Sequence, residues 1–310
     1  MTVDAAPGAA ATLGGALPAL VTPLSDPTTL DPVGLGDLVR RALADGASGV
    51  LVAGTTGEGS LLEPEQRAEL TALARAVMTD LDVTGAAWLL AGASGPSLPA
   101  LHADVARLAA AGADAVLVLP PPLQPLTPDE VADLHLAVAE RAAVPTLVYH
   151  IPQLTGSPLT PEAVRRIAAH ERIVGMKDSS PDADRRAAFV DAVADVDDFA
   201  VLTGHAPTLA AALTAGVSGS ITAVANVRLR RIVALHAAVA AGADGDAEVA
   251  RLQAGLTRLI AGIAAVGASV PAVLKAALQL DGVLGERWCT PPLASVPGNR
   301  LDHVRTAMLR

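Results

Sequence analysis

The stretch TLVYHIPQLTGSPLTPEAVRRIAAHERIVGMKD, residues 146–178, decides the fold because it contains one complete strand–helix–strand unit. Its two ends, 146–151 and 173–178, are short apolar runs that do not alternate with polar residues. Such runs are typical of strands buried on both faces of a parallel sheet. Between them, LTPEA places Thr160 at an expected helix N-cap and Pro161 in the first turn. The stretch therefore predicts one β/α unit.

The same pattern recurs along most of the chain. Six further apolar runs predict strands at 16–22, 49–55, 86–92, 114–120, 200–204 and 220–224. Prolines are tolerated in a first helical turn, and they predict further helix starts at Pro32, Pro64, Pro99, Pro128 and Pro207. Glycines in ADGASGV (44–50), AAGADAV (110–116) and TAGVSGS (214–220) mark expected helix ends before the next strand.

Eight such units in about 225 residues predict a closed (β/α)8 TIM barrel. A doubly wound open sheet is the alternative, and it is disfavoured because no Gly-x-Gly-x-x-Gly turn follows any strand. We expect a flexible N-terminal tail over residues 1–14, a catalytic barrel over 15–242 and a C-terminal helical extension over 243–310. Within the extension, 246–281 reads as two helices.

Composition excludes several classes of function. The net charge is -10 and the pI is about 5.1, so no basic face is expected for a nucleic acid or an anionic membrane. No uncharged apolar run reaches the ~18 residues of a membrane span. The N-terminus lacks the basic and apolar regions of a signal peptide, and the single cysteine, Cys289, excludes an internal disulfide. A cytoplasmic protein is expected.

Lysine is rare in this chain. Only Lys177 and Lys275 are lysines among 22 Lys and Arg residues. Lys177 ends the sixth predicted strand, where barrel walls would enclose its amine and disfavour the charged form. A neutral amine there can attack a ketone and form a Schiff base; the alternative is a structural pair with Asp178 or Glu58. Lys275 falls in an amphipathic helix and is expected to be a surface or packing residue.

Two more features lie at predicted strand ends. Tyr149 is the only tyrosine and ends the fifth strand, where a phenol can relay protons; a core tyrosine is the alternative. The Gly-rich turn AGTTGEG (53–59) offers backbone N–H groups and the hydroxyls of Thr55 and Thr56 to a carboxylate. It lacks the Gly-Lys-Ser/Thr of a nucleotide-binding loop.

The remaining polar residues give weaker signals. The histidines show no metal-ligand spacing, so we expect no metal site. His150 alternates to the far side of its strand from Tyr149, which indicates an orienting or packing role. The arginine-rich VRLRRIV (227–233) reads as a solvated helix face.

Four motifs, GTTGEG (54–59), VYHIPQLTG (148–156), GMKDSS (175–180) and GSITAVANV (219–227), resemble the dihydrodipicolinate synthase / N-acetylneuraminate lyase family of class I aldolases. The resemblance runs from about Leu17 to Leu293. It implies a (β/α)8 barrel with a C-terminal helical extension, assembled as a homotetramer that is a dimer of dimers. It also implies a Schiff base between pyruvate, or another 2-oxo acid, and Lys177, with an aldehyde as the second substrate and no metal or other cofactor.

The resemblance also implies roles for other residues. Tyr149 matches the proton-relay tyrosine, and Thr55 and Thr56 match the hydroxyl pair at the substrate carboxylate, with Thr55 also in the relay. The predicted substrate-binding set is completed by Gly54, Ser179, Gly204 and Ile221, the last through its backbone.

Three departures bear on the substrate. Dihydrodipicolinate synthases carry an arginine for the aldehyde's carboxylate where this chain has Leu154. They also carry a tyrosine from a neighbouring subunit where this chain has Pro122. The acidic pair that holds sugar hydroxyls in neuraminate lyases is replaced by Ala206 and Pro207.

GMKDS and TAVANV most resemble the 4-hydroxy-2-oxoglutarate and 2-keto-3-deoxy-sugar-acid aldolases, and the sequence predicts an enzyme of that type. The alternatives are 4-hydroxy-tetrahydrodipicolinate (dihydrodipicolinate) synthase with an altered substrate clamp, and a non-catalytic paralogue that binds a 2-oxo acid. A metal-dependent class II aldolase is disfavoured by the histidine spacing.

Overall fold

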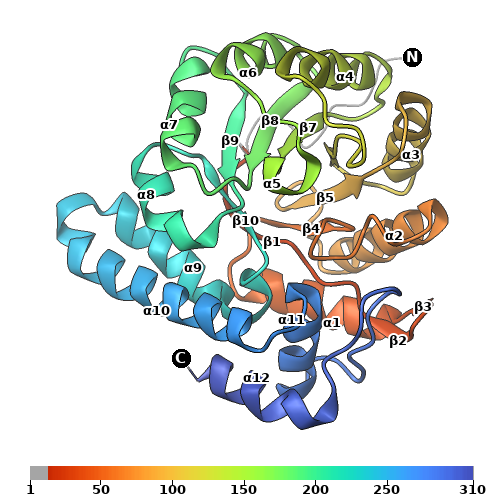
Figure 1. Ribbon diagram of the computed structural model, residues 1–310, viewed down its shortest axis with the longest axis vertical. Coiled ribbons are helices and arrows are strands. Elements are labelled where there is room, and N and C mark those ends of the chain that lie inside the picture. Colours follow the sequence, from red (N-terminus) through yellow and green to blue (C-terminus); the bar gives the residue numbers. More distant parts are fainter. Residues whose placement is uncertain (1–12, 310) are drawn as a thin grey trace.

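The computed structural model describes residues 13–309, and the predicted tail over 1–14 lies almost wholly outside this range. Eight parallel strands gather at the centre of the molecule in one sheet, in the order β1-β10-β9-β8-β7-β6-β5-β4 (Figure 1). Their bounds are β1 Gly15–Pro18, β4 Gly49–Val52, β5 Trp88–Ala93, β6 Ala115–Val118, β7 Thr146–His150, β8 Ile173–Asp178, β9 Ala200–Thr203 and β10 Gly219–Thr222. All eight predicted strands are present.

The sheet closes on itself between its first and last strands. Ala19, just past β1, forms a parallel bridge with Leu51 of β4, and the Leu20 N–H donates to the Leu51 carbonyl at 2.9 Å. Together with the pairing of β1 to β10, this completes a barrel. The (β/α)8 prediction is confirmed, and the open doubly wound sheet is excluded.

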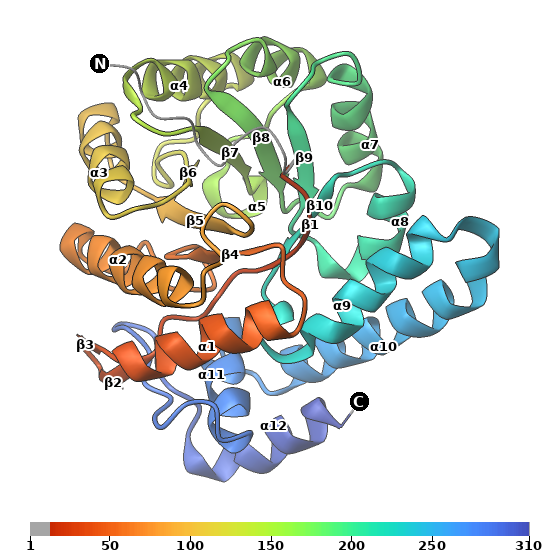
Figure 2. The same ribbon diagram turned by 180° about the vertical axis from the view of Figure 1, so that it is seen from behind.

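Helices surround the barrel on all sides (Figure 2). Seven longer helices follow the strands: α1 Pro32–Ala44, α2 Pro64–Asp80, α3 Leu98–Ala110, α4 Pro128–Arg141, α6 Pro161–Ala168, α7 Ala183–Ala192 and α9 Ala225–Ala240. The short α5 (Pro152–Thr155) and α8 (Leu209–Thr214) and the hairpin β2 Leu24–Asp26 with β3 Thr29–Leu30 complete this part. Sequence reasoning missed α5 and the hairpin, and it predicted no start for the helix of the unit that contains α7.

Most helix boundaries follow the predicted local chemistry. Five of the six prolines lie in a first helical turn; the exception is Pro207, which lies in a 3₁₀ turn (Ala206–Thr208) just before α8. Thr127 and Thr160 accept hydrogen bonds from the N–H groups of Glu130 and Ala163, as N-caps do. Helix α7 begins without proline, because Asp182 caps it instead.

Three predicted helix ends depend on glycine. Gly46, Gly112 and Gly216 have φ values of 93°, 96° and 91°. This left-handed region is strained for residues with a Cβ, so glycine turns the chain from each helix towards the next strand.

The C-terminal helices lie on one side of the barrel, next to α9 and α1 (Figure 1). The two predicted helices are α10 Asp246–Ala265 and α11 Val270–Leu280. A third, α12 Leu301–Met308, was not predicted and packs on both of them. Within residues 13–309, no single helix is long and apolar enough to cross a membrane. Helices α10 and α11 together have the required length and hydropathy, but the chain bends by 105° between them.

The barrel interior is filled by aliphatic side chains. These include Leu17, Leu51, Leu90, Leu117, Leu147, Leu202 and Ile221, all essentially inaccessible to solvent. Tyr149 belongs to the same cluster. Polar chemistry in such a barrel is therefore confined to the strand ends, and the carboxyl ends carry the predicted site residues.

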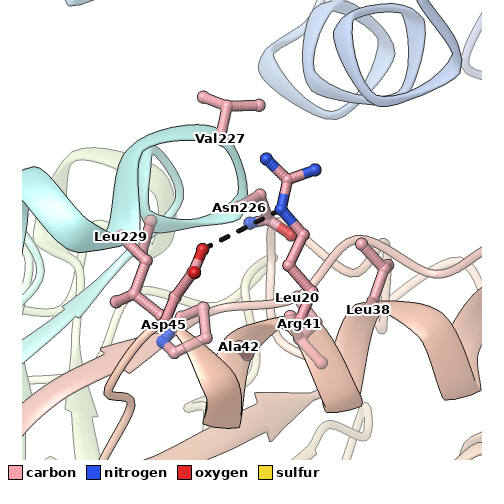
Figure 3. A pocket seen from close by; sticks show the side chains of 10 residues that line it. Leu20, Leu38, Arg41, Ala42, Asp45, Asn226, Val227 and Leu229 are labelled. Carbon is pink, nitrogen blue, oxygen red and sulfur yellow. Dashed lines mark ion pairs between the residues drawn. The ribbon is translucent and has the colours of Figure 1, made fainter. Parts of the chain in front are cut away.

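A small cavity of about 10 Å³ lies between α1 and α9 (Figure 3). The Arg41–Asp45 ion pair lies at its edge, and the Asn226 amide accepts from the Val21 N–H and donates to the Ala19 carbonyl. The volume is near the lower limit for one water molecule. The amide thus serves to tie α9 to the end of β1.

Candidate active site

Lys177 and Tyr149 lie side by side at the carboxyl ends of β8 and β7. They are direct partners in the register of these strands, and the Lys177 Nζ lies 4.4 Å from the centre of the Tyr149 ring. Both side chains are buried. A primary amine and a phenol are therefore held together within the barrel walls. Neither Asp178 nor Glu58, the two acidic partners considered for Lys177, forms an ion pair with it.

Thr55 completes this group from across the barrel. Its hydroxyl lies 3.1 Å from the Tyr149 hydroxyl, within hydrogen-bond distance. Burial pushes the pKa of Tyr149 upward, but the charge of Lys177 and the hydroxyls of Thr55 and Ser179 outweigh burial and lower the pKa below its usual 10.0. The surroundings thus favour loss of the phenol proton relative to a free tyrosine.

The turn that carries Thr55 and Thr56 has a defined internal structure. The Glu58 N–H donates to the Thr55 carbonyl at 3.1 Å, and the Gly59 N–H donates to the Gly54 carbonyl at 3.0 Å. Across the part of the chain that the structure describes, the N–H groups of 55–57 make no hydrogen bond. These N–H groups and the two threonine hydroxyls are suited to a carboxylate, as the sequence predicts.

Gly204 and Ser179 lie against Lys177. A Cβ at Gly204 would be 2.9 Å from the Lys177 Cε and 2.0 Å from the Ser179 hydroxyl, so only glycine fits beside them. The buried Ile221 lies in β10 and fills the barrel interior. The predicted residues 54, 55, 56, 177, 179 and 204 all lie at the carboxyl-end mouth.

A buried polar network lies behind the lysine and the tyrosine. The His150 Nδ1 lies 2.7 Å from Asp178 Oδ1, and the Arg186 Nε donates to Asp178 Oδ2 at 2.8 Å. The Leu159 N–H donates to His150 Nε2, which assigns the ring proton to Nδ1. His150 is thus buried and held on both ring nitrogens, and its ring also packs edge-on against Phe189, which fits the predicted orienting or packing role. The sequence analysis missed Asp178 and Arg186 as its partners, although His150 and Asp178 directly follow the paired residues Tyr149 and Lys177.

The sequence predicts a surface or packing residue at Lys275, and the structure excludes the surface position. The side chain of Lys275 is fully buried, and its Nζ lies 2.5 Å from Glu58 Oε1 in the predicted carboxylate-binding turn. An amphipathic pattern places a residue relative to its own helix only. It cannot reveal a partner more than 200 residues away in sequence.

Leu154 and Pro122 add no charge at the carboxyl-end mouth of the barrel, whereas the cavity beside Pro122 is also lined by the ion-paired Arg67, Asp104 and Arg107. Leu154 is 59% exposed, and Pro122 lines a cavity of about 630 Å³ together with Leu119, Leu123 and Ser94. A smaller cavity of about 20 Å³ between Thr55 and Tyr149 shares Leu119 and Ser94 with it. The larger cavity thus adjoins the smaller one, which Thr55 and Tyr149 line.

The arginine-rich segment 227–233 is only partly solvated. Arg230 is exposed, whereas Arg231 is half-buried, with one guanidinium nitrogen shielded from solvent and without a hydrogen bond in the described chain. Burial first, and then the neighbouring Arg228, Arg251 and Arg258, lower the pKa of Arg231. No group of three His, Cys, Asp or Glu residues suited to a metal ion occurs within residues 13–309.

Sequence comparison adds an independent line of support. The model of the dihydrodipicolinate synthetase family matches residues 12–309. A 4-hydroxy-tetrahydrodipicolinate synthase of Anaeromyxobacter dehalogenans is 33% identical, covering 96% of this chain and 97% of its own. The corresponding synthase of Hyphomonas neptunium is 34% identical over 76% of this chain and 78% of its own.

Solved structures agree with the sequence matches. The dihydrodipicolinate synthase of Thermotoga maritima superposes with a TM-score of 0.88 at 26% identity, covering 96% of this chain and 98% of its own. The chloride-inhibited synthase of Acinetobacter baumannii, solved in complex with pyruvate, superposes with a TM-score of 0.87 at 25% identity and the same coverage. The match over nearly the whole chain makes this protein an enzyme of the class I aldolase type, a lyase. The chain belongs to the dihydrodipicolinate synthetase family.

Proposed function

We propose that this enzyme makes or breaks a carbon–carbon bond between pyruvate, or a related 2-oxo acid, and an aldehyde through an imine on Lys177. The observation that carries the proposal is the grouping of the buried Lys177 and Tyr149 with the solvent-exposed Thr55, whose hydroxyl lies 3.1 Å from that of Tyr149, at one end of the barrel. The pyruvate bound in the Acinetobacter baumannii relative supports the choice of 2-oxo acid.

The chemistry follows from the positions of these groups. The Lys177 amine attacks the ketone carbon of pyruvate, and the carbinolamine loses water to give an imine. Loss of a proton from the methyl carbon gives an enamine, which adds to the aldehyde; the reverse sequence cleaves the bond. Tyr149 lies close enough to Lys177 to carry protons to and from the carbinolamine and aldol hydroxyls, and Thr55 extends the relay. The imine is itself the electron sink, so these steps call for no metal.

The substrate carboxylate is assigned to the turn 54–57. Free N–H groups at residues 55–57 and the hydroxyls of Thr55 and Thr56 supply neutral donors within one short turn. Binding of the carboxylate there leaves the ketone facing Lys177. Gly204 and Ser179 flank the same amine and bound the space for the methyl group.

Two aldehyde classes remain, each favoured by one observation. The names of the relatives favour 4-hydroxy-tetrahydrodipicolinate synthesis, in which the aldehyde is aspartate semialdehyde. Leu154 and Pro122 favour an aldehyde without a carboxylate, as in the sugar-acid aldolases, because neither residue can bind an anion. Several relatives support the synthase reaction, whereas Leu154 and Pro122, which are features of this chain, support the aldolase reaction.

A substrate panel separates the two candidates. Purified enzyme is incubated with pyruvate and either aspartate semialdehyde or neutral hydroxyaldehydes, and consumption of pyruvate is measured. Condensation of aspartate semialdehyde at the rate of an authentic family synthase assigns the synthase reaction. Faster turnover of the neutral aldehydes assigns the aldolase reaction. If the protein binds pyruvate but turns over no aldehyde, the result would support the third alternative, a non-catalytic paralogue that binds a 2-oxo acid.

Assembly and location belong to the same proposal. We infer a cytoplasmic homotetramer, built as a dimer of dimers, from the family resemblance. The 87% exposed Leu123, next to Pro122, provides apolar surface for a subunit contact. One solved relative is described as a monomeric synthase variant, so light scattering is the required measurement. A mass of four chains supports the proposal, and a mass of one chain contradicts it.

A further inference from the structure

Glu58 and Lys275 form an ion pair that is wholly removed from solvent. The Lys275 Nζ of α11 lies 2.5 Å from Glu58 Oε1, and both side chains are fully buried. Nζ also donates to the Trp288 carbonyl at 2.7 Å, and the Thr290 N–H donates to Glu58 Oε2. The C-terminal helices thus reach the turn 53–59 through a buried charge.

A buried ion pair of this kind contributes little net free energy to folding. Removing two charges from water costs much of what their attraction returns, and an apolar pair of similar size often serves as well. The backbone of the turn suggests what the pair does instead. Glu58 has a φ of 60° and Ala53 a φ of 52°, conformations that residues with a Cβ adopt only when their surroundings hold them.

A short series of contacts connects the ion pair to the reacting lysine. The Glu58 N–H donates to the Thr55 carbonyl at 3.1 Å, and the Thr55 hydroxyl lies 3.1 Å from the Tyr149 hydroxyl. The Tyr149 ring in turn lies against the Lys177 Nζ. A shift of Glu58 would therefore move Thr55 and the donors at residues 55–57.

We propose that the Glu58–Lys275 ion pair is a positioning device, through which the C-terminal helices hold the Thr55–Thr56 turn in the geometry that binds the substrate carboxylate. The inference rests on the proposed function of that turn. Glu58 and Lys275 touch no substrate in this account and act through Thr55. Their loss should raise the pyruvate concentration required for imine formation more than it lowers the maximal rate.

The test compares wild type with E58Q, K275M and the double variant E58Q/K275M. Borohydride trapping of pyruvate is measured against pyruvate concentration, and the melting temperature is measured in parallel. The single variants leave one buried charge unpaired and should melt at lower temperature. The double variant removes both charges and should recover much of the lost stability. Its half-saturating pyruvate concentration should nevertheless stay about 10- to 100-fold above wild type, as for a displaced binding group.

R75M is the matched control. Arg75 pairs with Asp114, which precedes β6 at the opposite end of the barrel, so R75M should lower stability without changing half-saturation. If the double variant regains both stability and the wild-type half-saturation, the pair is only structural and the inference is overturned.

Hydrogen exchange separates this inference from the proposed function. Amides of residues 53–59 should exchange faster in E58Q/K275M than in wild type, whereas those near Gly112 should not change. Unchanged exchange at 53–59 would overturn the positioning role. If wild type traps no pyruvate, the proposed function fails, and the exchange result still decides whether the pair orders the turn.

Discussion

Lys177 and Tyr149 are register partners on adjacent parallel strands, and the Lys177 Nζ lies 4.4 Å from the centre of the phenol ring. Side chains paired in this way project from the same face of the sheet at the same height. The barrel therefore fixes the amine and the phenol relative to each other through main-chain hydrogen bonds, before any substrate binds.

The hydroxyl of Tyr149 should affect rate much more than structure. Y149F keeps the ring beside Lys177 and removes only the proton carrier. We expect imine formation to slow by about 10²- to 10⁴-fold, the usual contribution of a positioned acid–base group. The rate is measured by quenching pyruvate mixtures with borohydride at successive times. An adduct that forms at the wild-type rate in Y149F would remove Tyr149 from the mechanism.

Thr55 should control the ionisation of that phenol. Burial raises the pKa of Tyr149, but the charge of Lys177 and the hydroxyls of Thr55 and Ser179 lower this pKa by more than burial raises it. T55V removes one of these stabilising hydroxyls, so the pKa should move upward; T55S should keep it. Because Tyr149 is the only tyrosine, ultraviolet titration of phenolate reports it alone. Identical titration midpoints in wild type and T55V would contradict the hydrogen bond.

Leu154 should limit activity with aldehydes that carry a carboxylate. L154R places a guanidinium where family synthases have one, and Leu154 is exposed enough for the change to leave stability within about 0.5 kcal/mol. A charge-assisted hydrogen bond of about 1.5–3 kcal/mol predicts roughly a 10- to 100-fold gain in kcat/KM for aspartate semialdehyde. Neutral aldehydes serve as the control. An equal gain with those aldehydes would show that charge recognition is not the cause.

Asp178 should stabilise the fold through His150 and Arg186. Burial raises the pKa of its carboxyl, but His150 and Arg186 outweigh burial, and the folded-state pKa lies below the usual 3.8. This contribution to stability is therefore complete above pH 3.8 and is lost as pH falls through the lower folded pKa. D178N leaves Arg186 buried without its carboxylate, which should cost about 3–5 kcal/mol of unfolding free energy at pH 7.

Urea unfolding at several pH values tests this prediction. The difference between wild type and D178N should shrink below pH 3.8, because wild-type Asp178 then becomes neutral as well. D133N, which removes the exposed partner of Arg166, should cost no more than about 1 kcal/mol. A difference between wild type and D178N that stays constant down to the lowest pH would argue against the charged network.

The sequence was sufficient for the barrel because its signals are local. Apolar runs marked the strands, and Thr160 with Pro161 marked a helix start that the structure contains. The predicted strand 49–55 ends early, at Val52, because Ala53 takes a φ of 52° and opens the turn. Periodicity does not reveal this, since alanine is compatible with a strand.

The candidate site was only partly predictable for a related reason. Lys177 and Tyr149 were singled out because they are rare residues at predicted strand ends, and Thr55 because it lies in the Gly-rich turn 53–59. The ion pair of Lys275 with Glu58 and the network of Asp178 with Arg186 depend on contacts between distant segments. Such contacts leave no spacing pattern in one sequence, so only the folded chain shows them.

The central claim is that Lys177 forms the imine, and its most direct test is borohydride reduction with pyruvate followed by peptide mass analysis. The chain has only two lysines, and the buried, paired Lys275 serves as an internal control. We predict one reduced-pyruvate adduct on the peptide that contains Lys177, none on the peptide that contains Lys275, and none in K177R. Absence of an adduct on Lys177, under conditions that label an authentic family synthase, would contradict the account.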